Sequence, residues 1–194
     1  FTFQAMSYVI DVYRGDTPAQ KKLSNILLYI SLFPQLIAGP IVKYHDIEKQ
    51  IDKREVNFTN YSLGVRRFLF GLFKKVLIAN NAGAVWSLIS NMDHSGISMS
   101  TAWLGAIAYS LQIYFDFSGY SDMAIGLGKM FGFDFLENFN YPYISKSIRE
   151  FWRRWHISLS TWFKEYLYIP LGGSRKGNLR TYVNLFIVFF CTGL

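Results

Sequence analysis

The stretch SGISMSTAWLGAIAYSLQIYF, residues 95–115, contains no charged side chain and ends at Asp116. A bilayer core about 30 Å thick is crossed by roughly 20 mostly apolar residues in an α-helix. Because this stretch has that length and composition, it is the clearest candidate for a membrane-spanning helix in the sequence. It favours an all-α membrane protein.

Other apolar runs extend this prediction to a polytopic protein. They lie at residues 1–10, 23–42 and 76–92, and in a run that opens at Thr181. Residues 23–42 are interrupted by Pro34, Gly39 and Pro40, so a broken or re-entrant helix fits them as well as a straight span. Aromatic and basic residues alternate after Lys129, which predicts interfacial helices around residues 137–170.

The composition narrows the class of protein. Hydrophobic residues make up 51% of the chain, aromatic residues 19%, and the net charge is +7. This combination suits membrane interfaces, and the apolar runs are too long for a soluble nucleic-acid-binding module. The single cysteine, Cys191, excludes an internal disulfide framework. Because the chain starts without methionine and stops inside an apolar run, we expect an internal piece of a longer protein.

Charge asymmetry predicts how the apolar runs are oriented. Residues 76–92 and 95–115 are expected to form a hairpin whose outer ends are basic, at Lys74 and Lys75 and after Lys129. The tip between them carries Asp93 and His94 but no Lys or Arg. Since Lys and Arg accumulate in cytoplasmic loops, the tip is predicted to lie outside the cytoplasm. Residues 43–67 are predicted to be a charged loop that contains a helix.

A titratable imidazole, His156, lies in the stretch REFWRRWHISLST, residues 149–161. If residues 149–163 form one helix, Trp152, His156 and Phe163 share a face. Nearby arginines and burial both favour the neutral imidazole, which can accept a proton from a hydroxyl group. The alternative is a histidine that only makes a hydrogen bond at an aromatic membrane interface. In the same helix Glu150 and Arg154 are spaced for an ion pair.

A second polar group ends the clearest apolar run, in YFDFSGYSDMAIGLG, residues 114–128. Carboxylates at membrane depth must be paired or must line a watery cavity. Pairing with Arg149, Arg153 or Arg154 would satisfy both charges without any chemistry. The polar side chains in question are Asp116, Ser118, Ser121 and Asp122.

Two glycine-rich segments and two further histidines are weaker candidates. GLGKMFG, residues 126–132, matches neither a dinucleotide fingerprint nor a P-loop. PLGGSRKG, residues 170–177, fits a phosphate site no better than a turn between two helices. His45 and His94 are not part of any metal-binding pattern, and no metal site is predicted.

Four segments together resemble the membrane-bound O-acyltransferase (MBOAT) family, in particular its bacterial alginate O-acetyltransferase branch. The blocks YFDFSGYSDMA and FWRRWHISLS carry most of the likeness, which covers nearly the whole chain. The segments are LFPQLIAGPIVKY (32–44), GLFKKVLIANN (71–81), LQIYFDFSGYSDMAIGLGKMFGF (111–133) and ENFNYPYISKSIREFWRRWHISLSTWFKEYLYIPLGG (137–173).

The resemblance implies a multi-pass enzyme of the bacterial inner membrane whose helices surround a tunnel. Such an enzyme takes an acetyl group from a cytoplasmic donor, expected to be acetyl-CoA, and passes it toward an exported polysaccharide. Periplasmic partners of the SGNH-hydrolase type and membrane lipid are implied too, with no bound cofactor. Residues 1–194 would then be an internal part of a single MBOAT-type transmembrane domain, truncated at both ends and inactive alone.

The resemblance also assigns residues. His156 matches the family's first signature histidine, whereas the main catalytic histidine is expected beyond Leu194. Arg153 and Arg154 are candidates for binding anionic donor groups or lipid headgroups. Three residues are candidates for the tunnel wall: Asp116, Ser118 and Asp122.

Other functions compete with this interpretation. A D-alanyl or peptidoglycan-modifying acyltransferase of the same family has a different donor or acceptor. A transporter predicts substrate flux without consumption of an acyl donor. A membrane scaffold predicts that changing His156 affects stability alone.

Overall fold

The computed structural model describes residues 2–36, 39–54, 56–93 and 97–193, so His94 lies outside the described residues. Across these ranges the chain forms helices joined by turns and loops, and no β-strand is present in them. The chain divides into two compact units. Unit 1 comprises Phe1–Leu32, Pro40–Asp52 and Leu136–Leu194, and unit 2 comprises Phe33–Gly39 and Lys53–Phe135.

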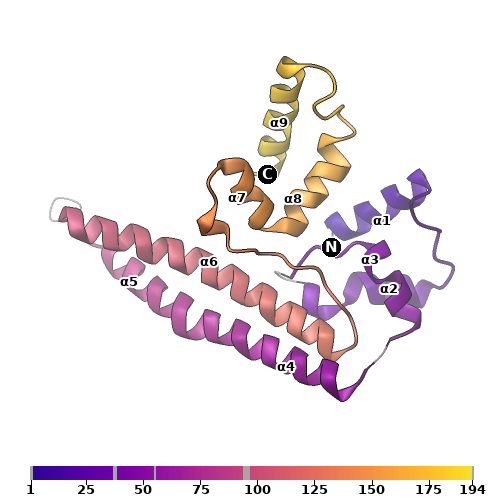
Figure 1. Ribbon diagram of the computed structural model, residues 1–194, viewed down its shortest axis with the longest axis horizontal. Coiled ribbons are helices and arrows are strands. Elements are labelled where there is room, and N and C mark those ends of the chain that lie inside the picture. Colours follow the sequence, from indigo (N-terminus) through magenta and orange to yellow (C-terminus); the bar gives the residue numbers. More distant parts are fainter. Residues whose placement is uncertain (1, 37–38, 55, 94–96, 194) are drawn as a thin grey trace. The chain divides into compact units, whose positions relative to one another are not determined.

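Unit 2 is built on a long helical hairpin (Figure 1). Its first arm runs without a break through α4 (Phe58–Phe73), a π-helical segment η2 (Lys74–Ala79) and α5 (Asn80–Ser90). Its second arm is α6, Met99–Met130. Side chains cap both arms, since Asn57 accepts a hydrogen bond from the Asn60 amide at 2.7 Å and Ser98 accepts one from Thr101 at 3.2 Å.

The expected hairpin is therefore present, but its predicted limits were wrong. Lys74 and Lys75 lie inside the first arm rather than at its start, and α6 continues well past Asp116. Among the described helices, only Phe58–Ser90 is both long and apolar enough to cross a membrane by composition. Since Lys74 and Lys75 lie within the helix rather than at its end, they do not mark a cytoplasmic boundary.

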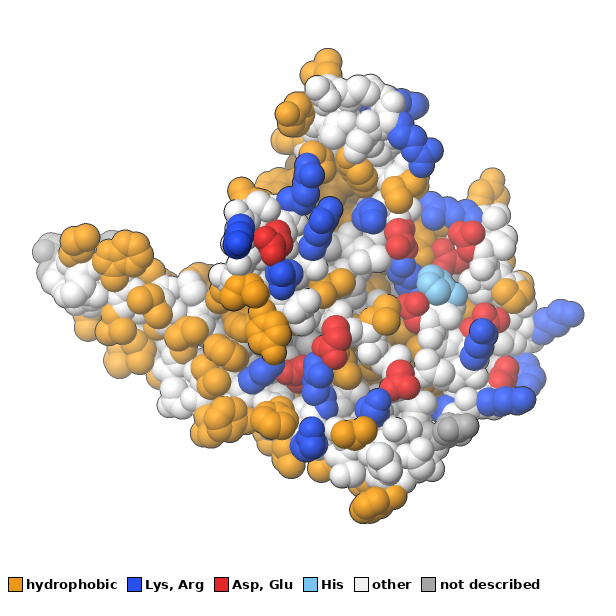
Figure 2. All heavy atoms as spheres, viewed as in Figure 1, with side chains coloured by type: hydrophobic (Ala, Val, Ile, Leu, Met, Phe, Trp, Pro, Cys, Tyr) orange, Lys and Arg blue, Asp and Glu red, His pale blue; other side chains and the backbone are white. Residues whose placement is uncertain are grey.

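The hairpin exposes large hydrophobic side chains along its length. Figure 2 shows many of them on the surface of the hairpin, over α5 and the first half of α6. An exposed apolar surface of this extent is typical of a protein that contacts lipid or other apolar protein. Prominent members are Leu69, Phe70, Phe73, Leu77, Trp103, Leu104 and Ile107.

Unit 1 consists of shorter helices from both ends of the chain. From the N-terminal half come α1 (Thr2–Arg14), α2 (Leu23–Ser31) and α3 (Tyr44–Asp52), and the last confirms the helix expected in the charged segment. From the C-terminal half come a 3-10 turn η4 (Pro142–Ile144), α7 (Ile148–Arg154), α8 (Ile157–Phe163), a π-helical segment η5 (Lys164–Tyr168) and α9 (Asn178–Thr192).

The interrupted run at residues 23–42 is broken rather than straight. Helix α2 ends at Ser31. It is followed by a short 3-10 turn, η1 (Phe33–Gln35), which contains Pro34. Pro34 has no N–H group to donate to the carbonyl four residues earlier, and its ring would clash with that carbonyl, so α2 cannot continue through Pro34. At 1.5 Å per residue, the nine residues of α2 are too short to cross a bilayer.

An aromatic cluster joins the two ends of the chain inside unit 1. Trp162, Phe163 and Tyr166 are buried side by side on α8 and η5. The ring of Phe3 on α1 lies 4.5 Å from that of Trp162, whose indole nitrogen donates to the Phe3 carbonyl at 2.9 Å. These contacts hold α1 against the helices that follow His156.

Candidate functional site

His156 lies at a break between two helices. Helix α7 ends at Arg154, Trp155 is extended, and His156 itself has a left-handed backbone with φ 45° and ψ 56° before α8 begins. The single helix predicted over residues 149–163 is therefore wrong. Trp152, His156 and Phe163 do not share one helical face.

The break follows from a crossing segment at residues 138–140. The Asn138 carbonyl accepts a hydrogen bond from Ile157 at 3.0 Å, and the Asn140 amide donates to the Arg154 carbonyl at 2.9 Å. Both groups would otherwise bond within a continuous helix. A left-handed conformation costs a residue with a side chain roughly 1–2 kcal/mol, and these backbone bonds offset that cost.

The side chain of Asn138 completes this arrangement. It is fully buried, and its Oδ1 accepts hydrogen bonds from the Ser158 amide at 3.1 Å and the Ser158 hydroxyl at 2.9 Å. The same oxygen lies 3.1 Å from Nδ1 of His156. The Ser158 hydroxyl is 3.5 Å from that nitrogen, so Asn138 is the closer partner of the imidazole.

Burial lowers the pKa of His156 from 6.5 to about 4. The imidazole is therefore neutral near pH 7, as predicted from the sequence. Burial alone explains the change, whereas the sequence argument had also invoked nearby arginines.

This pKa predicts an acid-sensitive stability. Between pH 6.5 and pH 4 the unfolded chain binds a proton at His156 that the folded chain does not, so the free energy of unfolding should fall as the pH falls. The loss should reach up to about 3 kcal/mol below pH 4. Unfolding of the full-length protein in detergent at pH 7 and pH 4.5 measures it. His156→Gln should have a flatter pH dependence, and equal slopes would contradict the assignment.

Arg154 and Arg153 differ in their surroundings. Arg154 bonds to Glu150 at 3.0–3.1 Å, which confirms the predicted ion pair, and it also donates to the Asn140 carbonyl at 3.1 Å. It thus braces the crossing segment. Arg153 is exposed near the end of α7.

The carboxylates of α6 are paired within unit 2. Asp122 is buried and accepts from Arg67 at 2.6–2.8 Å and from Lys74, while Asp116 bonds to Lys75. The pairing with Arg149, Arg153 or Arg154 suggested by the sequence is therefore wrong: the partners lie on α4 and η2. The hydroxyl of Ser118 is buried and has no hydrogen-bond partner within the described ranges.

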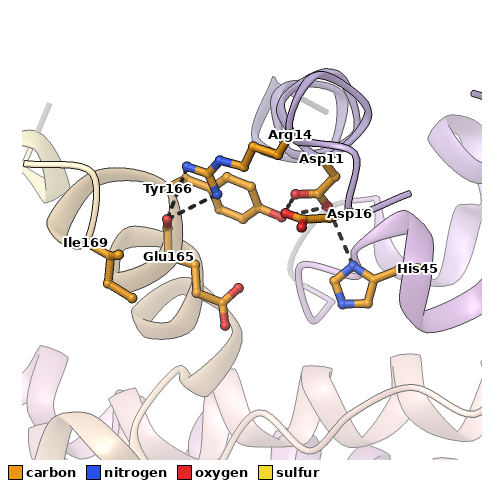
Figure 3. Close-up of a pocket in the computed structure, with 7 residues that line it drawn as sticks. All are labelled: Asp11, Arg14, Asp16, His45, Glu165, Tyr166 and Ile169. Atoms are coloured by element: carbon orange, nitrogen blue, oxygen red, sulfur yellow. Dashed lines mark hydrogen bonds and ion pairs between the residues drawn. The ribbon is translucent and has the colours of Figure 1, made fainter. Parts of the chain in front are cut away.

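A pocket of about 440 Å³ in unit 1 was not predicted from the sequence (Figure 3). His45 had been considered only as a weak candidate, and Asp11, which directly follows the apolar run at residues 1–10, had not been singled out. The residues that line the pocket come from distant parts of the sequence and form no local motif. Sequence patterns therefore could not reveal the pocket. Its lining comprises Asp11, Arg14, Asp16, His45, Glu165, Tyr166 and Ile169.

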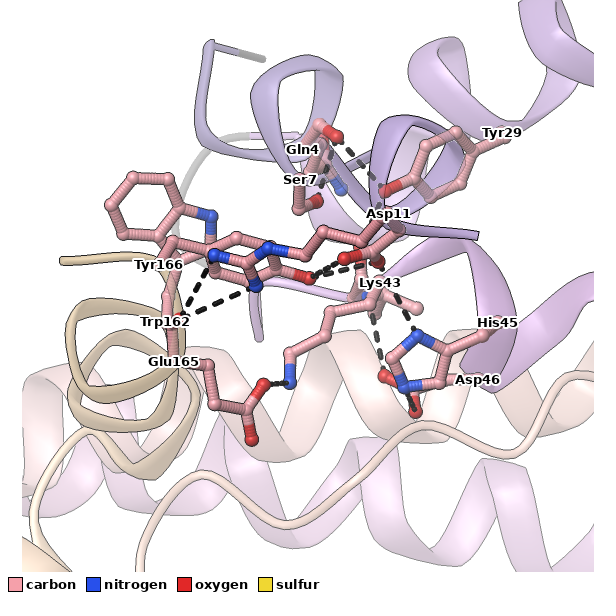
Figure 4. Close-up of polar contacts among 12 residues, drawn as sticks. Gln4, Ser7, Asp11, Tyr29, Lys43, His45, Asp46, Trp162, Glu165 and Tyr166 are labelled. Carbon is pink, nitrogen blue, oxygen red and sulfur yellow. Dashed lines mark hydrogen bonds and ion pairs between the residues drawn. The ribbon is translucent and has the colours of Figure 1, made fainter. Parts of the chain in front are cut away.

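The polar groups of this pocket bond to one another (Figure 4). Tyr166 donates to both oxygens of Asp11 at 2.7 and 2.8 Å, and burial, followed by Asp11, raises the pKa of this phenol. His45 lies 3.5 Å from Asp11, and Lys43 bonds to Glu165. Since Asp11, His45, Glu165 and Tyr166 each have a partner, these contacts primarily join α1, α3 and η5.

The second glycine-rich segment is a turn. Gly172, Gly173 and Gly177 have positive φ between η5 and α9. Asn184 of α9 donates to the Gly173 carbonyl at 2.9 Å and so fixes the turn. In the portion of the chain that is described, no group of three or more His, Cys, Asp or Glu side chains is arranged to hold a metal ion.

Comparison with known sequences identifies the family. The sequence profile of the MBOAT, membrane-bound O-acyltransferase, family matches residues 6–194. The chain belongs to this family. The matched range includes His156, all of unit 2 and all of unit 1 except its first five residues. The apolar surface of the hairpin fits the membrane location of MBOAT proteins.

Named MBOAT relatives match over most or all of the chain. A probable alginate O-acetylase AlgI of Pseudomonas fluorescens is 53% identical over 100% of the chain and 39% of its own length. A peptidoglycan O-acetyltransferase of Helicobacter pylori is 43% identical over 100% of the chain and 42% of its own length. A teichoic acid D-alanyltransferase of Bacillus subtilis is 33% identical over 87% of the chain and 43% of its own length. The chain thus spans about two-fifths of these relatives.

Proposed function

We propose that this chain is part of an O-acetyltransferase that modifies an exported polysaccharide such as alginate. The observation that carries the proposal is the 53% identity, over the whole chain, to a probable alginate O-acetylase. Identity falls to 43% for the peptidoglycan O-acetyltransferase and 33% for the D-alanyltransferase. Because both acetyltransferases are more similar to the chain than the D-alanyltransferase is, the identities favour acetyl transfer over D-alanyl transfer.

The proposed enzyme is a multi-pass protein of the bacterial inner membrane, with re-entrant and interfacial helices around a tunnel. Acetyl-CoA on the cytoplasmic side is the proposed donor, and an SGNH-type periplasmic protein is the proposed partner in the final transfer. We further propose that the main catalytic histidine lies C-terminal to Leu194 in the full-length enzyme. Membrane lipid surrounds the exposed apolar face of the hairpin.

The described residues contribute three parts to this proposal. His156 supplies a neutral imidazole in a hydrogen-bonded break between helices, suited to orient the substrate or to accept a proton. Arg153 is exposed and suited to an anionic donor group or lipid headgroup. Asp116 and Asp122 are paired, so their proposed role is to hold the hairpin together.

Replacing His156 tests the proposal. In cells carrying the full-length gene, His156→Gln should lower the acetyl content of the exported polysaccharide by about 100-fold, the usual effect of a proton-transferring group. Membrane levels of the protein are measured in parallel. His45→Gln is the matched control, since this exposed histidine lies on α3, where it contacts Asp11 and Asp46 rather than the residues of the break, and should leave acetylation unchanged.

Two results would contradict the proposal at different levels. Normal acetylation with His156→Gln would make His156 a packing residue and leave the enzyme assignment standing. Unchanged acetylation after deletion of the whole gene would overturn the acetyltransferase assignment itself. A transporter would then be tested by substrate flux without donor consumption.

A further inference from the structure

The orientation of the Asn138 amide is fixed by its partners. The Ser158 backbone amide lies 3.1 Å from one end of that side chain, and an N–H group can only donate. The atom facing it must therefore be the carbonyl oxygen Oδ1 and not the amide nitrogen. Because Asn138 is fully buried, water does not compete for this position.

This orientation decides where His156 carries its proton. Oδ1 of Asn138 has no hydrogen, so its contact with Nδ1 of His156 at 3.1 Å requires a proton on Nδ1. A neutral imidazole carries one N–H, and its other nitrogen, Nε2, then has the lone pair. The Ser158 hydroxyl points its own hydrogen at Oδ1 at 2.9 Å and does not displace the imidazole.

We propose that Asn138 is a positioning residue that holds His156 in the Nδ1–H form and so makes Nε2 the proton-accepting nitrogen. The inference rests on the proposed role of His156 in acetyl transfer. When Nε2 takes a proton from a hydroxyl group, the imidazolium keeps its bond from Nδ1–H to Oδ1. The ring therefore needs no rotation or tautomer change during the transfer.

Two substitutions separate positioning from packing. Asn138→Ala removes the acceptor and should reduce acetylation at least tenfold at equal protein level. Asn138→Asp keeps an acceptor for Nδ1–H, so it should restore part of the activity. Its negative charge also favours the imidazolium, so the acid limb of the pH–activity profile should move up by about one pH unit or more. Asn140→Ala is the matched control, because the exposed Asn140 uses its backbone in the break.

A spectroscopic measurement tests the inference without relying on activity. In the full-length protein with ¹⁵N-labelled histidine, the wild type should show a protonated Nδ1 and an unprotonated Nε2 for His156. Asn138→Ala should shift the population toward the Nε2–H form. A wild type with protonated Nε2, or an Asn138→Asp profile that does not move, would overturn the role of Asn138. Full activity of His156→Gln would instead refute the underlying role of His156.

Discussion

Replacing Asp122 with asparagine is expected to destabilise the helical hairpin by about 2 kcal/mol or more. The Asp122 carboxylate is nearly buried, with a side chain 9% exposed, and it is paired with both Arg67 and Lys74. Asparagine keeps the shape but removes the negative charge that Arg67 and Lys74 share. Their partial exposure, 37% and 30%, moderates the loss relative to a fully buried pair. Unfolding of the full-length protein in detergent measures it.

Asp116→Asn is the matched control for this prediction. Asp116 lies on the same helix and pairs with one lysine, but its side chain is 47% exposed. Exposed ion pairs contribute at most about 1 kcal/mol, so this variant should remain close to wild type in stability. If the two variants lost the same stability, burial of the Asp122 pair would not be what holds the hairpin.

The sequence predicted the helical hairpin but not its limits. The lengths of the apolar runs between charged residues placed helices at residues 76–92 and 95–115, because charges were treated as helix ends. Lys74, Lys75 and Asp116 instead lie inside helices, where each charge finds a partner on the opposite arm. Pairing between distant residues is not visible in a local pattern. The start of the first helix was therefore placed too late in the chain, and the end of the second too early.

The candidate site shows the same limit. The sequence singled out His156 and its neutral form, and it predicted the bond between Glu150 and Arg154. It missed the helix break, because the competing hydrogen bonds come from Asn138 and Asn140, far earlier in the chain. Asn138 was present in the family-like block ENFNYPY, but nothing in the sequence linked it to an imidazole. The roles of the site residues in acyl transfer remain predictions.

Gly126→Ala is expected to lower the free energy of unfolding by about 2–3 kcal/mol, the upper range for overpacking. At Gly126 a Cβ atom would lie 2.6 Å from the Phe68 amide nitrogen and 2.7 Å from the Gly64 carbonyl oxygen. Both are backbone atoms of α4, so no side-chain rotation relieves the clash and the helices must separate. Gly71 and Gly119 form a second close backbone contact between α4 and α6. Small residues permit such close contacts between membrane helices.

Gly83→Ala distinguishes this clash from a general effect of added methyl groups. At Gly83 the new Cβ atom would meet only the flexible side chain of Gln112, with Nε2 at 2.9 Å. Alanine also favours a helix over glycine by up to about 1 kcal/mol, so Gly83→Ala should be neutral or stabilising. Both variants are compared by unfolding of the full-length protein in detergent. A Gly126→Ala protein as stable as Gly83→Ala would show that α4 and α6 do not depend on backbone contact at this crossing.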